Sequence, residues 1–199
     1  MATNKKQIIT ACICIFSVTA LAQQTELTAF NKERERISRT GLKVLAGYSA
    51  ANIIYGSIAA GQATGSNKYF HEMNAIWNGI TLGITGIGFL TAKKEGIFSY
   101  SESIKKQQNI EKLFLFNGGL DVAYIAGGAY LKERAKTTTK NPHRLKGYGE
   151  SVMLQGAVLL LFDGIMYAIH NMHGKALAKM GEKVQLTTSG NGIGLLVKL

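Results

Sequence analysis

Residues 44–67 read VLAGYSAANIIYGSIAAGQATGSN, a stretch without a charged side chain, and residues 73–92, MNAIWNGITLGITGIGFLTA, are equally uncharged. Two further apolar stretches hold one carboxylate each, Asp121 within 113–131 and Asp163 within 151–169. Each stretch has about the 20 residues that an α-helix needs to cross a lipid bilayer. The pattern predicts an all-α fold, a four-helix transmembrane bundle made of two helical hairpins.

A water-soluble helical bundle is the alternative, and the mean hydropathy of +0.06 is compatible with it. A surface helix in water, however, carries charged side chains along its outer face, and these stretches do not. They carry small residues four positions apart instead, a spacing that lets helices approach closely in lipid. These are Gly47 with Ala51, Gly56 with Ala60, Gly79 with Gly83, and Gly119, Ala123 and Gly127. The spacing favours the membrane interpretation.

The N-terminus has the three parts of a secretory signal peptide. Lys5 and Lys6 precede the largely apolar run 8–21, and Ala20-Leu21-Ala22 supplies small residues at a cleavage site. We therefore predict export, with residues 1–22 as the signal peptide. Both cysteines, Cys12 and Cys14, lie in this segment, so the mature chain is expected to hold no thiol and no disulfide.

The rest of the chain divides into three predicted parts. Residues 23–43 form a charged lead-in helix with apolar residues at helical spacing, and residues 44–175 form the four-helix membrane domain. Near the end, two short apolar runs flank Ser189-Gly190-Asn191-Gly192, a sequence typical of a β-turn. The pattern predicts a β-hairpin tail over residues 182–199.

The chain has a net charge of +11, from 23 basic and 12 acidic residues. The basic residues gather at the ends of the uncharged stretches, which argues against a nucleic-acid partner. We expect the lipid bilayer and either an envelope protein or further copies of the chain as partners. The predicted location is the inner membrane, with both termini in the periplasm. Seven cations then lie in the inner loops and fourteen outside, which conflicts with the usual excess of cations on the cytoplasmic side.

Counting along each predicted span, at about 1.5 Å per residue, places four polar side chains at one depth. They are Asn52, Thr85, Asp121 and Asp163. A second polar cluster is expected near the inner surface, from Glu72, Asn74, Asn78, Glu150 and Gln155. The alignment of Asn52 with Asp121, and of Thr85 with Asp163, also indicates a duplicated helical hairpin.

Two interpretations of the aspartates stay open. Asp121 and Asp163 either hydrogen-bond across the bundle and fix its packing, or share a proton or bind a cation, because like charges in a poorly solvated site cannot both ionise easily. His71 at one end and His170 at the other are expected to lie too far apart to ligate one haem, and His170 and His173 are expected as solvated interfacial residues. We expect no catalytic group, no cofactor and no metal.

Three sets of residues have the character of family motifs. They are Tyr69-Phe70-His71-x-Met73-Asn74-x-x-Trp77-Asn78, Tyr148-Gly149-x-Ser151-x-x-x-Gln155-Gly156, and Phe162-Asp163 with the segment ending at His170. As a set they resemble an uncharacterised family, a domain of unknown function in small exported multi-span proteins of double-membraned bacteria. The resemblance covers residues 31–175 and implies a four-helix hydrophobic core, but no activity.

We expect a non-enzymatic integral membrane protein of the cell envelope, an accessory or structural subunit of an envelope complex. Its small-residue helix faces, its tail and its basic loops all offer surfaces to a partner. The alternative is a small proton- or cation-coupled transporter or channel that uses the intramembrane layer of Asp, Asn and Thr side chains.

Overall fold

The computed structural model describes residues 3–91, 96–182, 184–189 and 192–197, with side chains over 24–91 and 96–181. Its helices are α1 (Thr3–Gln62), α2 (Gly65–Thr91), α3 (Tyr100–Arg134) and α4 (Pro142–Glu182). Two short strands, β1 (Val184–Ser189) and β2 (Gly192–Val197), pair antiparallel. The predicted signal segment is helical from Thr3 and continues without a break into the predicted lead-in helix.

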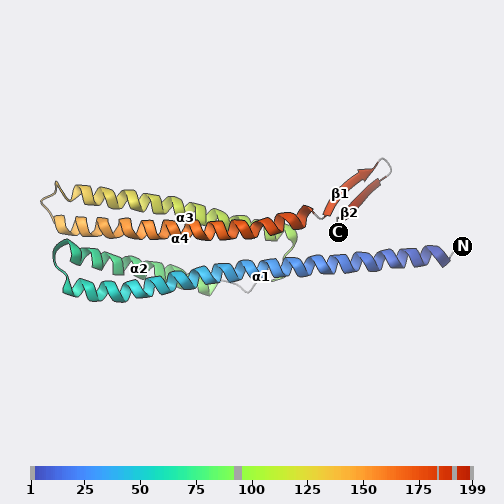
Figure 1. Cartoon of the computed structure of the whole chain (residues 1–199), viewed down its shortest axis with the longest axis horizontal. Helices are drawn as coiled ribbons and strands as arrows, with labels where there is room; N and C mark the ends of the chain where they lie inside the picture. The colour runs from blue at the N-terminus through green and yellow to red at the C-terminus, as the bar shows by residue number, and fades with distance from the viewer. Residues whose placement is uncertain (1–2, 92–95, 183, 190–191, 198–199) are drawn as a thin grey trace.

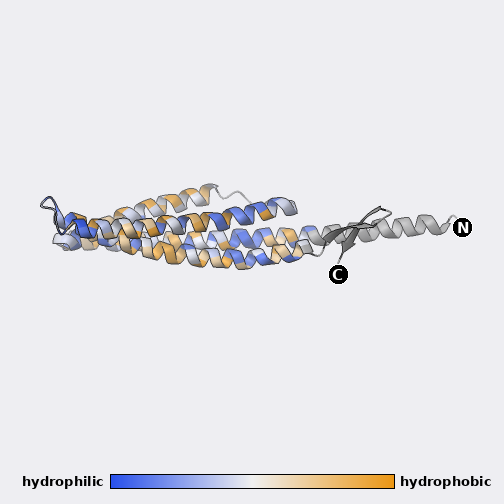
Figure 2. Ribbon diagram, turned by 90° about the horizontal axis from the view of Figure 1, so that it is seen from above, coloured by the Kyte–Doolittle hydropathy of each residue, from blue (hydrophilic) through white to orange (hydrophobic). Residues whose placement is uncertain are grey.

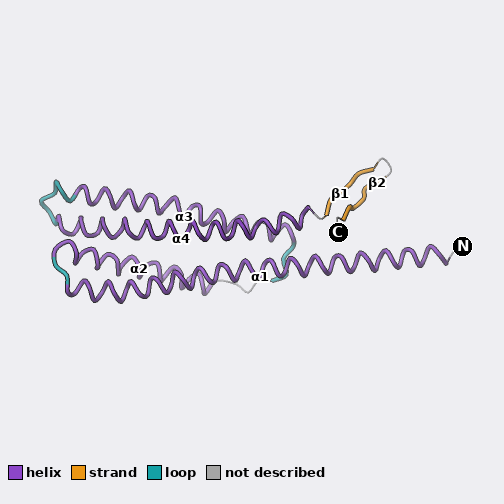
Figure 3. The backbone as a smooth tube through the Cα atoms, in the orientation of Figure 1, coloured by secondary structure: helices purple, strands orange, loops and turns teal. Residues whose placement is uncertain are grey.

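The helices form a long rod from two antiparallel hairpins, α1 with α2 and α3 with α4 (Figure 1). Helix α2 packs along α4 and joins the hairpins, whereas the α2 and α3 backbones do not come into contact over the described residues. The two hairpin turns lie at one end of the rod, and the start of α1 and the strands lie toward the other (Figure 3).

Helix α2 is shorter than its neighbours, with 27 residues or about 40 Å. The rod therefore has two halves. We call the end with the hairpin turns the four-helix half, which contains residues 44–91 and 113–169. The other end is the three-helix half, which contains residues 24–43, 96–112 and 170–181 of α1, α3 and α4 and the segment before α3.

Local chemistry explains where the helices begin. Helix α2 starts at Gly65, whose φ of +60° is unstrained only for glycine. Helix α4 starts at Pro142, because proline lacks an N–H and its fixed φ suits the first helical position. Helix α3 starts with a capping box, in which Ser99 and Glu102 bond each other's backbone N–H. The N–H of Ser99, assisted by its hydroxyl, holds the pKa of the Glu102 carboxyl below its ordinary value.

The two halves distribute polar and apolar side chains differently (Figure 2). The three-helix half contains an apolar cluster of Leu27, Phe30 and Leu177. In the four-helix half most of the buried side chains are polar, while large apolar ones lie on the surface. The exposed apolar residues there include Ile54, Ile58, Ile76, Ile80, Ile84, Ile87, Leu113, Phe116, Leu161 and Ile165. This polarity is the reverse of that in a water-soluble protein.

The prediction of a four-span transmembrane bundle is wrong. Among the described residues, only Gln24–Gln62 in α1 and Pro142–Gly181 in α4 are long and apolar enough to cross a membrane. Either helix is a candidate span, and the one near the N-terminus is equally a candidate signal sequence. Helices α2 and α3 fall short because their inward faces are polar: the buried positions of α2 are all asparagine or threonine, and those of α3 include Asp121.

The prediction that a C-terminal β-hairpin belongs to the fold class is also wrong, because the fold is all-α. In the part of the chain that the structure describes, β1 and β2 pair with each other and only β1 contacts a helix, the end of α4 just before it. A lone two-stranded ribbon is marginally stable in water. The two strands therefore add no layer to the helical rod.

Candidate functional site

A network of buried amides joins α1, α2 and α4 inside the four-helix half. Asn74 is its centre, since its Oδ1 accepts hydrogen bonds from Gln155 Nε2 and, at 3.3 Å, from Asn78 Nδ2. The Nδ2 of Asn74 donates to Asn52 Oδ1 at 3.2 Å. Tyr48 extends the network by donating its hydroxyl to Gln155 Oε1 at 3.2 Å. Because buried amides are costly without partners, these bonds fix α2 against both neighbours.

Two members of the predicted inner cluster lie outside this network. Glu72 Oε1 is 3.9 Å from Lys68 Nζ, and Glu150 Oε1 is 3.6 Å from Lys132 Nζ. The two carboxylate side chains are 33% and 29% exposed, and such surface ion pairs stabilise a protein little. The structure thus brings the three predicted amides together and leaves the two glutamates at the surface.

The four residues predicted to share one depth do not form a single layer. Asn52 belongs to the amide network. Thr85 is only 1% exposed, and its hydroxyl lies at hydrogen-bonding distance from the Thr81 and Leu82 carbonyl oxygens of its own helix. Asp121 and Asp163 do meet: their carboxyl groups lie within hydrogen-bonding reach of each other.

The carboxyl pair lines a cavity of about 400 Å³ between α2 and α3, which we call the α2–α3 groove. Asp121 is 3% exposed and Asp163 is 6% exposed. The rings of Trp77 and Tyr124 bridge the two helices edge to face, with centroids 4.8 Å apart. The remaining lining residues are Leu45, Ile80, Thr81, Ile84, Asn117, Leu120 and Leu159. The groove is therefore apolar along its walls and acidic in its interior.

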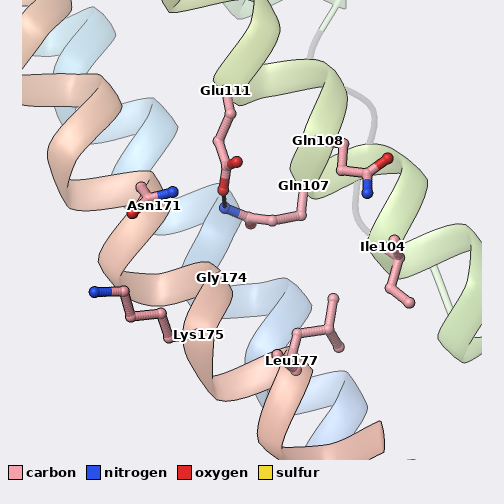
Figure 4. Close-up of a pocket in the computed structure, with 9 residues that line it drawn as sticks. Ile104, Gln107, Gln108, Glu111, Asn171, Gly174, Lys175 and Leu177 are labelled. Carbon is pink, nitrogen blue, oxygen red and sulfur yellow. Dashed lines mark hydrogen bonds between the residues drawn. The ribbon is translucent and has the colours of Figure 1, made fainter.

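A smaller cavity of about 240 Å³ lies between α3 and α4 in the three-helix half (Figure 4). There Gln107 Nε2 donates to Glu111 Oε1 at 2.8 Å and to the carbonyl oxygen of His170 at 2.6 Å. Gly174 makes room for this pair, because a Cβ at that position would lie 2.9 Å from Glu111 Oε1. The bond to the His170 carbonyl oxygen joins α3 to α4, so the residues at this cavity contribute to the packing of the two helices.

His170 is fully buried, so its expected place at a solvated interface is wrong. Its Nε2 lies 3.4 Å from Ser38 Oγ, a pairing that sequence spacing could not reveal because the two residues lie 132 positions apart. The Nδ1 of His170 has no hydrogen-bond partner over the described side chains. The pair therefore lacks the third group that orients a histidine base in a serine hydrolase.

Comparison with known protein families gives a match over more than half of the chain. A family of unknown function, DUF6992, matches residues 44–164. The chain belongs to this family. Comparisons with curated proteins and with solved structures found no match.

The DUF6992 match confirms the predicted resemblance to an uncharacterised family, over a shorter range than expected. It includes the amide network and the carboxyl pair. The charged start of α1 and the part of α4 that contains His170 lie outside it. The matched range therefore covers most of the four-helix half together with residues 96–112 of the three-helix half.

Proposed function

We propose that this DUF6992 protein is a non-enzymatic integral membrane protein of the cell envelope and acts as an accessory subunit of a larger complex. The observation that carries the proposal is the reversed polarity of the four-helix half, with amides and carboxyls inside and large apolar side chains outside. An extensive exposed apolar surface marks contact with a membrane or a partner. The candidate spans in α1 and α4 supply the crossing, and α2 and α3 pack beside them.

Side chains at the hairpin-turn end support a membrane boundary there. Tyr55 and Tyr130 are 62% and 64% exposed at this end, and aromatic residues are enriched where a membrane meets water. Beyond them lie the cations of the turns and the adjoining helix ends: Lys68, Lys132, Arg134, Lys136, Lys140, Arg144 and Lys146. In this proposal, the hairpin-turn ends of α1 and α4 face the cytoplasm and the opposite ends of these two helices face the periplasm.

Basic residues occur at both ends of the rod. In the three-helix half, Arg36 Nη2 lies 2.6 Å from Glu33 Oε1 and Arg39 Nε lies 2.5 Å from Glu35 Oε1. The seven cations of the turns and adjoining helix ends lie close to the candidate spans, and cations in such positions favour the cytoplasmic side.

This orientation is testable by thiol labelling in a background without Cys12 and Cys14. We expect a Lys175→Cys variant, at an exposed position of α4 in the three-helix half, to react with a membrane-impermeant maleimide in cells whose outer membrane has been permeabilised. A Thr139→Cys variant, in the turn before α4, is expected to react only after the inner membrane has been opened. If Thr139→Cys reacts while the inner membrane is intact and the variant in the three-helix half does not, the orientation is contradicted.

Several glycines on the outer surface of the helices have no neighbouring atoms, which supports the subunit role. Another helix already packs against Gly56 and Gly128, where an added Cβ would lie 3.0 Å and 2.6 Å from the backbone of the adjacent helix. A Cβ at Gly79, Gly83, Gly119 or Gly127 would meet nothing within 4 Å. Small residues at four-residue spacing allow close helix packing in lipid, so these faces are available to another chain.

Affinity purification from native membranes in mild detergent tests the subunit role. We expect an envelope protein to co-purify in fixed stoichiometry and most of it to be lost from a Gly83→Leu, Gly119→Leu variant, because the added side chains block close approach. Gly61→Leu is the matched control, since Gly61 is also without neighbours but lies at the end of α1. A chain that purifies only as an oligomer of itself, with a wet path past the carboxyl pair, would favour the proton- or cation-coupled transporter instead.

A further inference from the structure

Among the described side chains, no basic residue forms an ion pair with the two acidic groups of the α2–α3 groove. Asp121 and Asp163 are almost fully buried, and Oδ2 of Asp121 has no hydrogen-bond partner over the described side chains. The ion pairs found in the described part of the chain lie at its two polar ends. Carboxyl groups in apolar surroundings are costly unless they are protonated or paired with a cation.

Exposed apolar side chains continue beyond the lining of the groove along both helices. On α2, Ile76, Ile80, Ile84 and Ile87 recur at helical spacing, and all four are between 52% and 65% exposed. This row of isoleucines covers about 17 Å along the helix. On α3, Leu113, Phe116 and Leu120 form a matching row that is between 39% and 67% exposed.

Two parallel apolar rows with a space between them favour a helical ligand. A small molecule in a cavity of about 400 Å³ covers the carboxyl pair but leaves most of both rows exposed. An apolar helix covers both rows by packing its ridge of side chains between them. The cavity itself then accepts a single long side chain from that helix.

Resting on the proposed subunit role, we infer that the α2–α3 groove binds an apolar helix of a partner protein that carries one basic side chain, which enters the groove and pairs with Asp121 and Asp163. A second copy of this chain does not fit the requirement. Its four apolar stretches, 44–67, 73–92, 113–131 and 151–169, contain no lysine or arginine. The partner is therefore a different membrane protein.

The test uses the full chain in phosphatidylcholine nanodiscs and synthetic apolar helical peptides as probes. One peptide carries a single central lysine, and its matched control carries leucine at that position. We expect energy-transfer measurements to show that the lysine peptide binds about three- to tenfold more tightly, because a polar pair between helices in lipid is worth roughly that much. Asp121→Asn with Asp163→Asn should remove this difference, whereas Glu102→Gln, in the three-helix half, should preserve it.

Equal binding of the two peptides would overturn the inference, and so would a lysine preference that survives in the double variant. Leu120→Trp provides a second route if the double variant does not fold, because the added ring fills the groove and should weaken the lysine peptide without removing a charge. Self-association of the chain that is lost in Leu120→Trp would instead identify a second copy as the occupant and reject the inference. Undiminished co-purification of the envelope partner with the double variant would reject the groove site while leaving the subunit role intact.

Discussion

A Gly128→Ala substitution is expected to lower the free energy of unfolding by about 2 kcal/mol, the usual cost of overpacking a tight contact. A Cβ at Gly128 would lie 2.6 Å from the Gly149 carbonyl oxygen and 2.7 Å from the Met153 amide nitrogen. Both atoms belong to the α4 backbone, so neither can move aside unless α3 and α4 separate. The measurement is denaturation of the purified full chain in mild detergent, followed by circular dichroism.

Gly127 supplies the control because it is the neighbouring residue on the same helix. A Cβ there would meet nothing within 4 Å, so Gly127→Ala is expected to keep or slightly raise stability through the better helix propensity of alanine. The same loss of stability in both variants would contradict close packing of α3 on α4 as the cause, because an added Cβ meets a neighbour only at Gly128.

An Asn74→Leu substitution is expected to destabilise the chain by about 2–3 kcal/mol. It removes the acceptor shared by Gln155 and Asn78 and the donor to Asn52. Each buried group left without a partner costs about 1–3 kcal/mol in a protein interior, and the cost is smaller between helices in lipid. Thermal unfolding in the same detergent measures the change, and loss of α2 from the bundle should appear as faster proteolysis of the α2–α3 connection.

Asn67→Leu is the matched control, because Asn67 lies on the same helix but is exposed. Its substitution is expected to change stability by less than about 0.5 kcal/mol, as surface substitutions usually do. An unchanged melting temperature in Asn74→Leu would contradict the prediction and show that the amide network adds no net stability to the four-helix half.

Much of the helical architecture could be predicted from residue patterns. Most residues of the four apolar stretches lie in α1 to α4, and apolar residues at helical spacing in residues 23–43 correspond to part of α1. The turn at residues 63–64 could not be found in this way, because it falls inside the uncharged stretch 44–67. No charge or proline marks it, and only the positive φ of Gly65 shows where α2 begins.

The candidate site was predictable in part. Counting along the chain placed Asp121 and Asp163 at one depth, and the structure brings them together. It also selected Asn74, Asn78 and Gln155, which do form one network. The role of Tyr48 was not predicted, because a tyrosine in an apolar stretch gives no local sign that its hydroxyl meets an amide from α4.

Residue patterns alone indicate most of the helical segments, how far along each helix a polar side chain lies and which side chains are charged. These are local properties, set by composition and by the fixed rise of an α-helix. The packing of α2 on α4 rather than on α3 is visible only in the folded chain. It opens the groove onto Asp121 and Asp163 and directs Asn52 toward Asn74. The rise of a helix fixes the depth of a residue but not the neighbour that its side chain faces, because that depends on which helix surfaces pack together.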